Sequence, residues 1–560
     1  MINAAEIVVV AGVLAALGLP RLWSRLRLSR AKHPSLAGHS RMAKRVAALV
    51  PGYSFDGPGF FRADGAPEEI AQRRETAFGL MAKRLRQQYP KGLALTDAAM
   101  PLLSDLQLTA AYRVPFPFSK RVREELPSAP FAVASRGNRL LDADGNEVID
   151  LTGSYGVNLF GNDFYKATIE AGLARTQALG TVLGYYHPIV IENARRIAAL
   201  AGQDEVSFHM SGTEAVMQAV RLARHHTRRT RVVRFCGAYH GWWGDVQPGP
   251  GNPMAADATY TLRDMDERSL QVLATRKDIA CVLVNPLQAL HPNSPAPADS
   301  GLVAAGRRAT FERAAYTRWL QQLREVCTKR GIPLIFDEVF VGFRLAKGGA
   351  QEYFGVRADL VTYGKTLGGG LPVGVVCGQR RFMRRFDDAH PADLCFARGT
   401  FNAHPAVMGT MSAFLDALDQ PATAALYRQL DERWAERAGR LNAQLAAACL
   451  PVHIAALGTI WTVLYAKPSR YNWMFQYYLR RAGLALSWVG SGRLIFSLDF
   501  TDEDFNEVCA RFQGAAHDML ADGWWWTPAA ATNAQVGRRV LHEMLQASWH
   551  RRRRERAGQS

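Results

Sequence analysis

The chain has 560 residues and a formal net charge of +18, with 48% hydrophobic and 10% aromatic residues. This composition excludes a disordered chain and supplies apolar side chains for a large core in more than one domain. The seven cysteines include no Cys-x-x-Cys pair, which argues against a disulfide framework or a metal site and favours a reducing compartment.

The positive charge is concentrated near the two ends of the chain. Residues 21–45 contain eight basic residues and no acidic residue, and residues 551–556 contain five arginines and one glutamate. Basic runs next to apolar segments are typical of contact with an anionic membrane surface, and the sequence has no nucleic-acid-binding motif. We therefore expect a membrane contact and no nucleic-acid partner.

An uninterrupted apolar run covers residues 7–19. With the residues before it, this run barely approaches the ~20 residues that a membrane-spanning helix needs. Basic residues follow the run instead of preceding it, which argues against a secretory signal and predicts that the rest of the chain stays in the cytoplasm. We predict that residues 1–30 form a membrane anchor, either spanning or interfacial; a helix docked on the protein is the alternative.

Residues 31–128 form a predicted helical extension without a catalytic constellation. Pro67 is followed by Glu68 and Glu69, and early acidic residues favour a helix N-terminus, so a helix is predicted as far as Tyr89. We interpret the region as a packing or substrate-access extension, in preference to a separate enzymatic domain. Further along, residues 139–150 predict a hairpin, because Asp144-Gly145 supplies the positive φ angles of a tight turn.

A phosphate-binding turn is one interpretation of Ser211-Gly212-Thr213. Apolar residues recur three and four positions apart after Ala215, which predicts a helix that begins at this turn. A helix N-terminus suits a phosphate, and glycine lets the backbone approach closely. Taken alone, the same turn is more commonly a plain helix cap.

Two short apolar runs end in residues with reactive side chains. Residues 334–336 precede Asp337, and Tyr363-Gly364 precede Lys365. Since ligands bind beyond the carboxyl ends of strands in open α/β sheets, we predict that both side chains point into one crevice. Pyridoxal phosphate chemistry requires a lysine that bonds the cofactor and an aspartate on its ring nitrogen.

Five motifs occur in a characteristic order: Ser211 to Ala215, Tyr239-His240-Gly241, Phe336 to Val339, Gly342-Phe343-Arg344 and Gly364-Lys365. With them the chain resembles the class III aminotransferases, and within that family glutamate-1-semialdehyde aminomutase. The resemblance covers roughly residues 129–520. It implies an α/β fold of the fold-type I pyridoxal phosphate transferases, with a mostly parallel seven-stranded sheet.

The resemblance also implies the domain boundaries. Residues 129–418 are expected to form the cofactor-binding large domain with its N-terminal hairpin, and residues 419–522 a small α+β domain. Residues 523–560 are left as a tail rich in tryptophan and arginine. The tryptophans at 524–526 and 549 fit either a second membrane-interfacial element or burial against the domain.

The resemblance assigns a role to each residue of the cofactor site. Lys365 bonds pyridoxal 5'-phosphate and carries protons, and Asp337 keeps the ring nitrogen protonated. Tyr239 and Val339 are expected on opposite faces of the ring. The phosphate is held by Ser211, Gly212, Thr213 and, from the second chain, Thr400 of the partner subunit. This last assignment implies a homodimer with shared active sites.

The substrate residues are less well defined. By resemblance, Ser154 and Tyr155 are candidate substrate contacts, with core packing as the alternative. Arg493 lies where many members grip a substrate carboxylate, although a surface position is the alternative. Three departures from the family pattern argue against the usual glutamate or alanine amino donor. Asn285 replaces a glutamate, Leu290 stands near the place of a second, gating glutamate, and Met210 replaces a common asparagine.

Three functions compete at this stage. The first is amino transfer to or within a carbonyl substrate, which the membrane contact suggests is long-chain or carrier-bound. The second keeps the cofactor but condenses an amino acid with an acyl thioester, releasing carbon dioxide. The third is a catalytically silent membrane scaffold, against which the intact Lys365 and Asp337 argue. We favour the first function.

Overall fold

The computed structural model describes residues 19–34, 36–247, 249, 251–254, 258–290, 293, 309, 311–487, 492–528 and 531–557. Contacts between Cα atoms divide the chain into two compact units. Unit 1 comprises Met1–Ala47, Ala174–Ala296 and Glu312–Leu415, and unit 2 comprises Ala48–Leu173, Pro297–Phe311 and Asp416–Ser560. Most of the predicted extension therefore belongs to the same unit as the C-terminal third of the chain.

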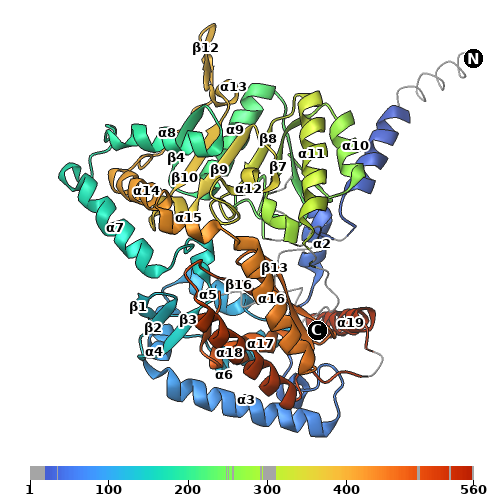
Figure 1. Cartoon of the computed structure of the whole chain (residues 1–560). Coiled ribbons are helices and arrows are strands. Elements are labelled where there is room, and N and C mark those ends of the chain that lie inside the picture. The colour runs from blue at the N-terminus through green and yellow to red at the C-terminus, as the bar shows by residue number, and fades with distance from the viewer. Residues whose placement is uncertain are drawn as a thin grey trace, which may run out of the picture. The chain divides into compact units, whose positions relative to one another are not determined.

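Unit 1 contains a seven-stranded sheet (Figure 1). Strand β10 runs antiparallel to its neighbours β4 and β9, and the remaining pairs are parallel. This confirms the predicted mostly parallel sheet. The strands are, in spatial order, β4 (Glu205–His209), β10 (Gly374–Gly378), β9 (Leu360–Gly364), β8 (Leu334–Asp337), β7 (Ile279–Val284), β5 (Arg231–Phe235) and β6 (Thr259–Leu262).

Helices cover the sheet of unit 1. Helix α9 packs on β7, β9 and β10 through a buried face that includes Ala215 and Ala219, and α10 packs beside α11 (Figure 1). A small hairpin of β11 (Phe386–Asp387) and β12 (His390–Leu394) follows the sheet. The other elements of this unit are η1 (Leu36–Gly38), α2 (Ser40–Leu49), η4 (Gln177–Leu179), α8 (Ile189–Ala201), α9 (Gly212–Thr227), α10 (Glu267–Thr275), η5 (Pro286–Leu290), α11 (Arg313–Arg330), α12 (Gly349–Phe354), η7 (Lys365–Gly368), α13 (Arg380–Met383) and α14 (Pro405–Leu418).

Unit 2 has two small sheets flanked by helices. One sheet has the order β1-β2-β3-β15, and its β2–β3 hairpin turns at the predicted Asp144-Gly145, where Gly145 has φ +88°. The other is antiparallel, in the order β13-β14-β16. The strands are β1 (Ala132–Arg136), β2 (Arg139–Asp142), β3 (Glu147–Asp150), β13 (Val452–Leu457), β14 (Ile460–Tyr465), β15 (Leu484–Ala485) and β16 (Arg493–Ile495).

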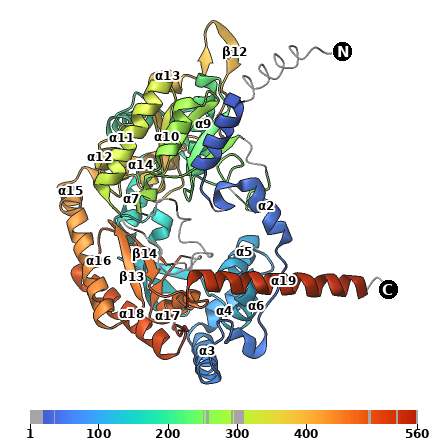
Figure 2. The same ribbon diagram turned by 90° about the vertical axis from the view of Figure 1, so that its right-hand side faces the viewer.

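In unit 2, the helix predicted to run as far as Tyr89 is α3. Thr501 caps α18 through a reciprocal hydrogen-bond pair with Asp504. Figure 2 shows α19, which ends at Ala557, as a long helix near the C-terminus. The helices are η2 (Gly57–Phe60), α3 (Glu68–Gln88), α4 (Pro90–Ala99), α5 (Ser104–Tyr112), α6 (Phe116–Glu125), η3 (Gly153–Gly156), α7 (Asn162–Thr176), α15 (Pro421–Tyr427), α16 (Leu430–Ala447), η8 (Asn472–Met474), α17 (Phe475–Arg481), α18 (Asp502–Ala521) and α19 (Asn533–Ala557).

A buried arginine ties the extension to the C-terminal part of unit 2. Arg74 of α3 forms an ion pair with Asp64 at 2.7 Å, and its Nε donates to the carbonyl of Gly523 at 2.9 Å. Its guanidinium also lies 4.5 Å from the ring centroid of Tyr471. The neighbouring Trp524 is fully buried, so this part of the tail packs against the domain, and the membrane-interface alternative does not apply to it.

The predicted anchor over residues 1–30 lies outside the described residues as far as residue 18. Residues 19–31 form a helix, drawn in dark blue in Figure 1, which continues into a bridge between Lys32 and Leu262. Ser24 accepts a hydrogen bond from Arg276, at the end of α10. Within the ranges given above, no helix combines the length and the apolar character needed to cross a bilayer.

Candidate active site

Four neighbouring strand ends of unit 1 meet at one edge of the sheet. Strands β5, β7, β8 and β9 are parallel, so the residues that follow them emerge on the same side. Strand β5 leads to Tyr239 and His240, β7 to Asn285, β8 ends at Asp337, and β9 leads to Lys365. This arrangement places the two predicted catalytic residues at the ends of adjacent strands.

Asp337 forms a buried pair with a histidine. Its Oδ2 lies 2.8 Å from Nδ1 of His240, and its Oδ1 accepts hydrogen bonds from the backbone N–H of Val339 at 3.2 Å and the hydroxyl of Thr362 at 3.3 Å. Burial lowers the pKa of His240, and the hydrogen bond to Asp337 opposes that shift. Three donors therefore fix the carboxylate in one orientation.

Lys365 is held in an unusual backbone conformation. It has φ +49°, a left-handed conformation that costs a non-glycine residue roughly 1–2 kcal/mol. Burial lowers the pKa of its ammonium group, Asp337 opposes this shift, and Arg344 adds to it. A lysine with a lowered pKa has more of the neutral amine that reacts with carbonyl groups.

The predicted phosphate turn lies at the N-terminus of α9. Ser211 is the N-cap and accepts a hydrogen bond from the backbone N–H of Glu214 at 3.2 Å. A Cβ added to Gly212 would lie 2.5 Å from a methyl carbon of Val339, and one added to Gly241 would lie 2.6 Å from the hydroxyl of Thr213. The glycines thus bring the helix N-terminus close to the segments that carry Asp337 and His240.

Tyr239 is available to a ligand, whereas its backbone is fixed. Its side chain is 62% exposed in the isolated chain, and its carbonyl accepts a hydrogen bond from Nδ2 of Asn285 at 3.0 Å. The Oδ1 atom of Asn285 accepts from the backbone N–H of Leu287 at 3.1 Å. Asn285, which replaces the usual family glutamate, therefore joins the end of β7 to the loop after β5.

Glu338 has a structural role. It is buried, and its carboxylate accepts hydrogen bonds from the backbone N–H groups of Ala350 at 2.6 Å and Gln351 at 3.2 Å. Burial raises the pKa of this carboxyl to about 8. These contacts join the end of β8 to the start of α12.

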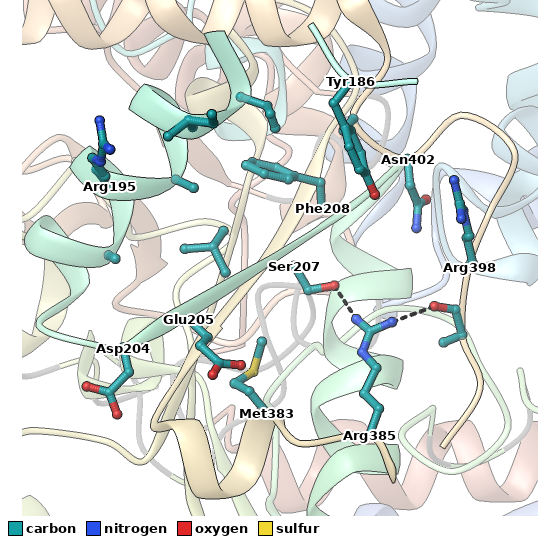
Figure 3. Close-up of a pocket in the computed structure, with 17 residues that line it drawn as sticks. Tyr186, Arg195, Asp204, Glu205, Ser207, Phe208, Met383, Arg385, Arg398 and Asn402 are labelled. Atoms are coloured by element: carbon teal, nitrogen blue, oxygen red, sulfur yellow. Dashed lines mark hydrogen bonds between the residues drawn. The ribbon is translucent and has the colours of Figure 1, made fainter. Parts of the chain in front are cut away.

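Thr400 lies on an exposed segment of unit 1, between β12 and α14. The same segment contributes Arg398 and Asn402 to a hollow of about 930 Å³ (Figure 3). Arg385 lines this hollow, donating to Ser207 at 2.5 Å and to the carbonyl of Ala397 at 2.7 Å. The hollow is separate from the Lys365 cluster, because neither Lys365 nor Asp337 lines it.

The predicted substrate residues belong to unit 2. Ser154 and Tyr155, both with positive φ angles, line a pocket of about 430 Å³. Arg493 begins β16, pairs with Thr462, and is not among the residues that line this pocket. Substrate binding by all three residues stays a prediction.

The sequence did not predict that His240 would be part of the active site through a hydrogen bond to Asp337. It lies within a quoted motif, directly after Tyr239, but the sequence gives no indication that it pairs with Asp337. The pairing forms only when β5 and β8 take their places on either side of β7. The one available signal was its position just beyond a predicted strand end.

Comparisons with known proteins address the identity of this site. The family described as aminotransferase class-III matches residues 122–244 and 312–516, more than half of the chain. The chain belongs to this family. A glutamate-1-semialdehyde 2,1-aminomutase of Acetivibrio thermocellus is 35% identical over 331 residues, covering 56% of this chain and 72% of that relative.

Solved structures agree with the class III assignment. A transaminase with PLP bound has 27% identity and a TM-score of 0.61, covering 78% of this chain and 99% of that one. A β-phenylalanine aminotransferase from Variovorax paradoxus has 25% identity and a TM-score of 0.62, covering 81% and 98%. The predicted fold, the enzymatic nature of the chain and its use of pyridoxal phosphate are confirmed. Amino transfer or aminomutation is its activity, and neither the condensation nor the scaffold alternative is favoured.

The residues present in this class III aminotransferase fit the cofactor. The α9 N-terminus offers backbone N–H groups and a positive dipole end for the phosphate. The buried Asp337 offers a negative charge for the ring nitrogen, and the partly buried Lys365 offers an amine with a lowered pKa. When bound, pyridoxal phosphate supplies an electron-accepting ring and a carbonyl group that takes up the amino group.

Proposed function

We propose that this enzyme moves an amino group to or within a carbonyl-bearing organic substrate, and that neither glutamate nor alanine is its preferred amino donor. The observation that carries the proposal is the segment after β7. The side chain of Asn285 already hydrogen-bonds to the backbone of Tyr239 and Leu287. The residues of η5 are all buried, and Leu290 is 0% exposed. Over its described residues 285–290, the segment therefore carries no carboxylate that could pair with a substrate-binding arginine after the donor leaves.

Asp337, Lys365 and the N-terminus of α9 have separate roles in the proposed amino transfer. Asp337, held by His240, would hold a proton on the ring nitrogen of bound pyridoxal phosphate, whose ring would then supply the electron-accepting group. Lys365 takes a proton from the substrate carbon and returns it elsewhere, a task for which its lowered pKa suits it. The α9 N-terminus holds the phosphate, so the cofactor stays in place while the amine is exchanged.

Aminomutation within one substrate is the version that the relatives' names support. The relative from Acetivibrio thermocellus is named as an aminomutase, and an intramolecular transfer has no need for a separate amino donor. That the carbonyl substrate is long-chain or carrier-bound stays a prediction.

A donor screen on the purified cofactor-bound enzyme tests this proposal. We expect the visible absorbance of the cofactor to be lost with ω-amino acids, simple amines or vicinal diamino acids, and to persist with L-glutamate and L-alanine. Equal or faster loss with glutamate would contradict the proposal. Release of carbon dioxide from an amino acid mixed with an acyl thioester would favour the condensation reaction instead.

We further propose that two copies of the chain form a homodimer through the exposed face around Thr400. Exposed aromatic side chains accompany this residue: Phe396 and Phe401, on either side of it in the sequence, are 70% and 49% exposed. Tyr186, which is 63% exposed, lines the same hollow as Arg398 and Asn402. Exposed apolar patches of this kind mark interaction sites. Thr400 would then reach the cofactor phosphate of the second subunit.

We also propose that the helix over residues 19–31 lies on the cytoplasmic surface of an anionic membrane. Leu19, Leu22, Trp23 and Leu26 are 53%, 52%, 61% and 42% exposed, and their spacing places them on one helix face. Exposed arginines, including those at 21, 25 and 30, accompany this apolar face. Such a pattern is typical of interfacial helices that bind acidic lipids.

Sedimentation of the full chain with vesicles that contain phosphatidylserine tests the membrane proposal. We expect wild-type protein to pellet with these vesicles and Trp23→Glu to remain in the supernatant. Leu102→Glu is the matched control, because Leu102 is 79% exposed on unit 2. Equal pelleting of wild-type and Trp23→Glu protein would refute the contact.

A further inference from the structure

Unit 2 contains a pocket that is lined by two arginines without an acidic partner. The pocket encloses about 430 Å³ between α3, the end of α5, the β2–β3 hairpin and α17. Arg113 is 6% exposed, and its Nη1 is buried without a hydrogen-bond partner. The Nε atom of Arg480 is likewise buried without a hydrogen-bond partner. The size is that of pockets that hold small organic ligands.

The contacts that these arginines do make are to neutral groups. Arg113 donates from Nη2 to the hydroxyl of Ser128 at 3.2 Å. Arg480 donates from Nη2 to the carbonyls of Leu486 at 3.0 Å and Ser487 at 2.8 Å. Among the residues that the structure describes, no carboxylate pairs with either guanidinium group.

The two guanidinium groups also repel one another. Burial and the charge of Arg113 lower the pKa of Arg480. Asp142, the acidic residue in the pocket lining, already accepts hydrogen bonds within the hairpin, from the backbone N–H groups of Asp144 and Asn146 and from the side-chain amide of Asn146. Charge that is buried without a counter-charge destabilises a fold, so an anion from outside the chain would stabilise this pocket.

The remaining walls restrict the kind of anion. Next to the arginines lies the buried hydroxyl of Tyr477, which has no hydrogen-bond partner. The other walls are mainly hydrocarbon: Met81, Leu85, Phe131, Leu140, Val148, Leu484 and Leu486. A bare phosphate ion would leave these walls in contact with water, whereas an acid with an apolar body would cover them.

We propose that this pocket binds an organic carboxylate with an apolar body, whose carboxylate lies between Arg113 and Arg480. The planar guanidinium group matches a carboxylate with two parallel hydrogen bonds. Ser154 and Tyr155, the predicted substrate contacts, line the same pocket. The ligand is therefore either the substrate of the proposed amino transfer or a separate effector of the same chemistry.

Calorimetric binding to the full-length, cofactor-bound protein tests the site without relying on turnover. The probes are straight-chain carboxylates from butyrate to decanoate and 4-phenylbutyrate, each compared with its neutral primary amide and with inorganic phosphate. We expect at least one carboxylate to bind at least tenfold more tightly than its amide and than phosphate. If every carboxylate binds no better than its amide, the proposal is wrong.

Variants locate the site within unit 2. Arg113→Met and Arg480→Met should each weaken carboxylate binding at least tenfold, whereas Arg86→Met, an exposed residue of α3 outside the pocket, should leave it unchanged. Because each pocket variant removes a buried charge that has no counter-charge, its melting temperature should not fall below that of wild type. Carboxylate binding that survives both pocket substitutions would overturn the assignment, and the comparison of acid with amide decides the matter even if a variant fails to fold.

The two possible roles of the ligand, substrate or effector, predict different kinetic results. If the ligand is the substrate, the tightest probe inhibits amino transfer competitively, and Arg480→Met raises KM for the carbonyl substrate. If it is an effector, the probe changes kcat without competing with the substrate. Both results support a carboxylate site. Failure of the amino-transfer proposal would appear in the donor screen and would leave the binding result intact.

Discussion

His240 supports the active site through one hydrogen bond. Its Nδ1 lies 2.8 Å from Asp337, and both side chains are buried, so this contact orients the carboxylate toward the position that the ring nitrogen would take. A hydrogen bond to a charged group contributes about 1.5–3 kcal/mol. The residue is a positioning residue, because it acts through Asp337.

Replacing this histidine should therefore weaken both cofactor binding and turnover. For His240→Leu we expect kcat to fall about tenfold to a hundredfold, since each 1.4 kcal/mol changes a rate tenfold, and the affinity for pyridoxal phosphate to fall in parallel. Steady-state rates and cofactor titration measure the two effects. His209→Leu is the control, because this other buried histidine bonds to Ser207; equal losses in both variants would show a general folding defect instead.

The lowered pKa of Lys365 has a consequence for pH. Burial penalises the charged ammonium group, so the neutral amine appears below the ordinary value of 10.5. Since the neutral form attacks the cofactor carbonyl, the rate of cofactor uptake by cofactor-free enzyme should rise with pH and level off before that value. Stopped-flow absorbance measures this rate. A midpoint at or above 10.5 would mean that the lysine is not perturbed.

The lowered pKa of Lys365 also determines how its contribution to the free energy of unfolding changes with pH. Below its folded-state pKa, Lys365 is charged in both the folded and the unfolded chain, and the burial penalty is fully present. As pH rises from that pKa toward 10.5, the unfolded chain binds more protons than the folded one at this site, so its contribution to the free energy of unfolding rises.

At the scale of one element, the N-terminus of α9 depends on the absence of a side chain at Gly212. A Cβ there would lie 2.5 Å from Val339, so either the turn or Val339 would have to move. We expect Gly212→Ala to lower the affinity for pyridoxal phosphate at least tenfold, which is about 1.4 kcal/mol. Fluorescence titration of the cofactor-free enzyme measures the affinity.

A second glycine provides the matched control. Gly439 lies inside α16, and a Cβ there meets nothing within 4 Å. Gly439→Ala should leave cofactor affinity unchanged and should stabilise unit 2 by about 0.5–1 kcal/mol, because alanine is the better helix former. If both glycine variants bind the cofactor like wild type, α9 does not hold the phosphate.

At the scale of the whole molecule, shared active sites can be tested by mixing two inactive variants whose substitutions lie in different parts of the active site. In a heterodimer of a Lys365→Ala chain and a Thr400→Glu chain, one site carries both defects and the other carries neither. Random pairing should therefore restore about a quarter of wild-type activity, whereas each parent is inactive. Sizing chromatography of the mixture is the accompanying control, and no recovery in mixtures that do dimerise would contradict sharing.

The sequence reveals the local parts of this molecule better than the distant ones. Asp337 and Lys365 could be predicted, because each ends a short apolar run that forms a buried strand, and Ser211 because a helical pattern follows it. The pairing of His240 with Asp337 could not, since it depends on which strands become neighbours. The meeting of Arg113 and Arg480 in one pocket depends in the same way on the extension folding together with α17.

The central claim is that Lys365 bonds the cofactor, and locating that bond tests it most directly. The purified enzyme is reduced with borohydride, digested and examined by mass spectrometry. The account predicts that pyridoxal phosphate is attached to the peptide that contains Lys365, that Lys365→Ala carries none, and that Lys347→Ala labels like wild type. Attachment to a different lysine, or an unlabelled Lys365 in protein that has bound the cofactor, would contradict it.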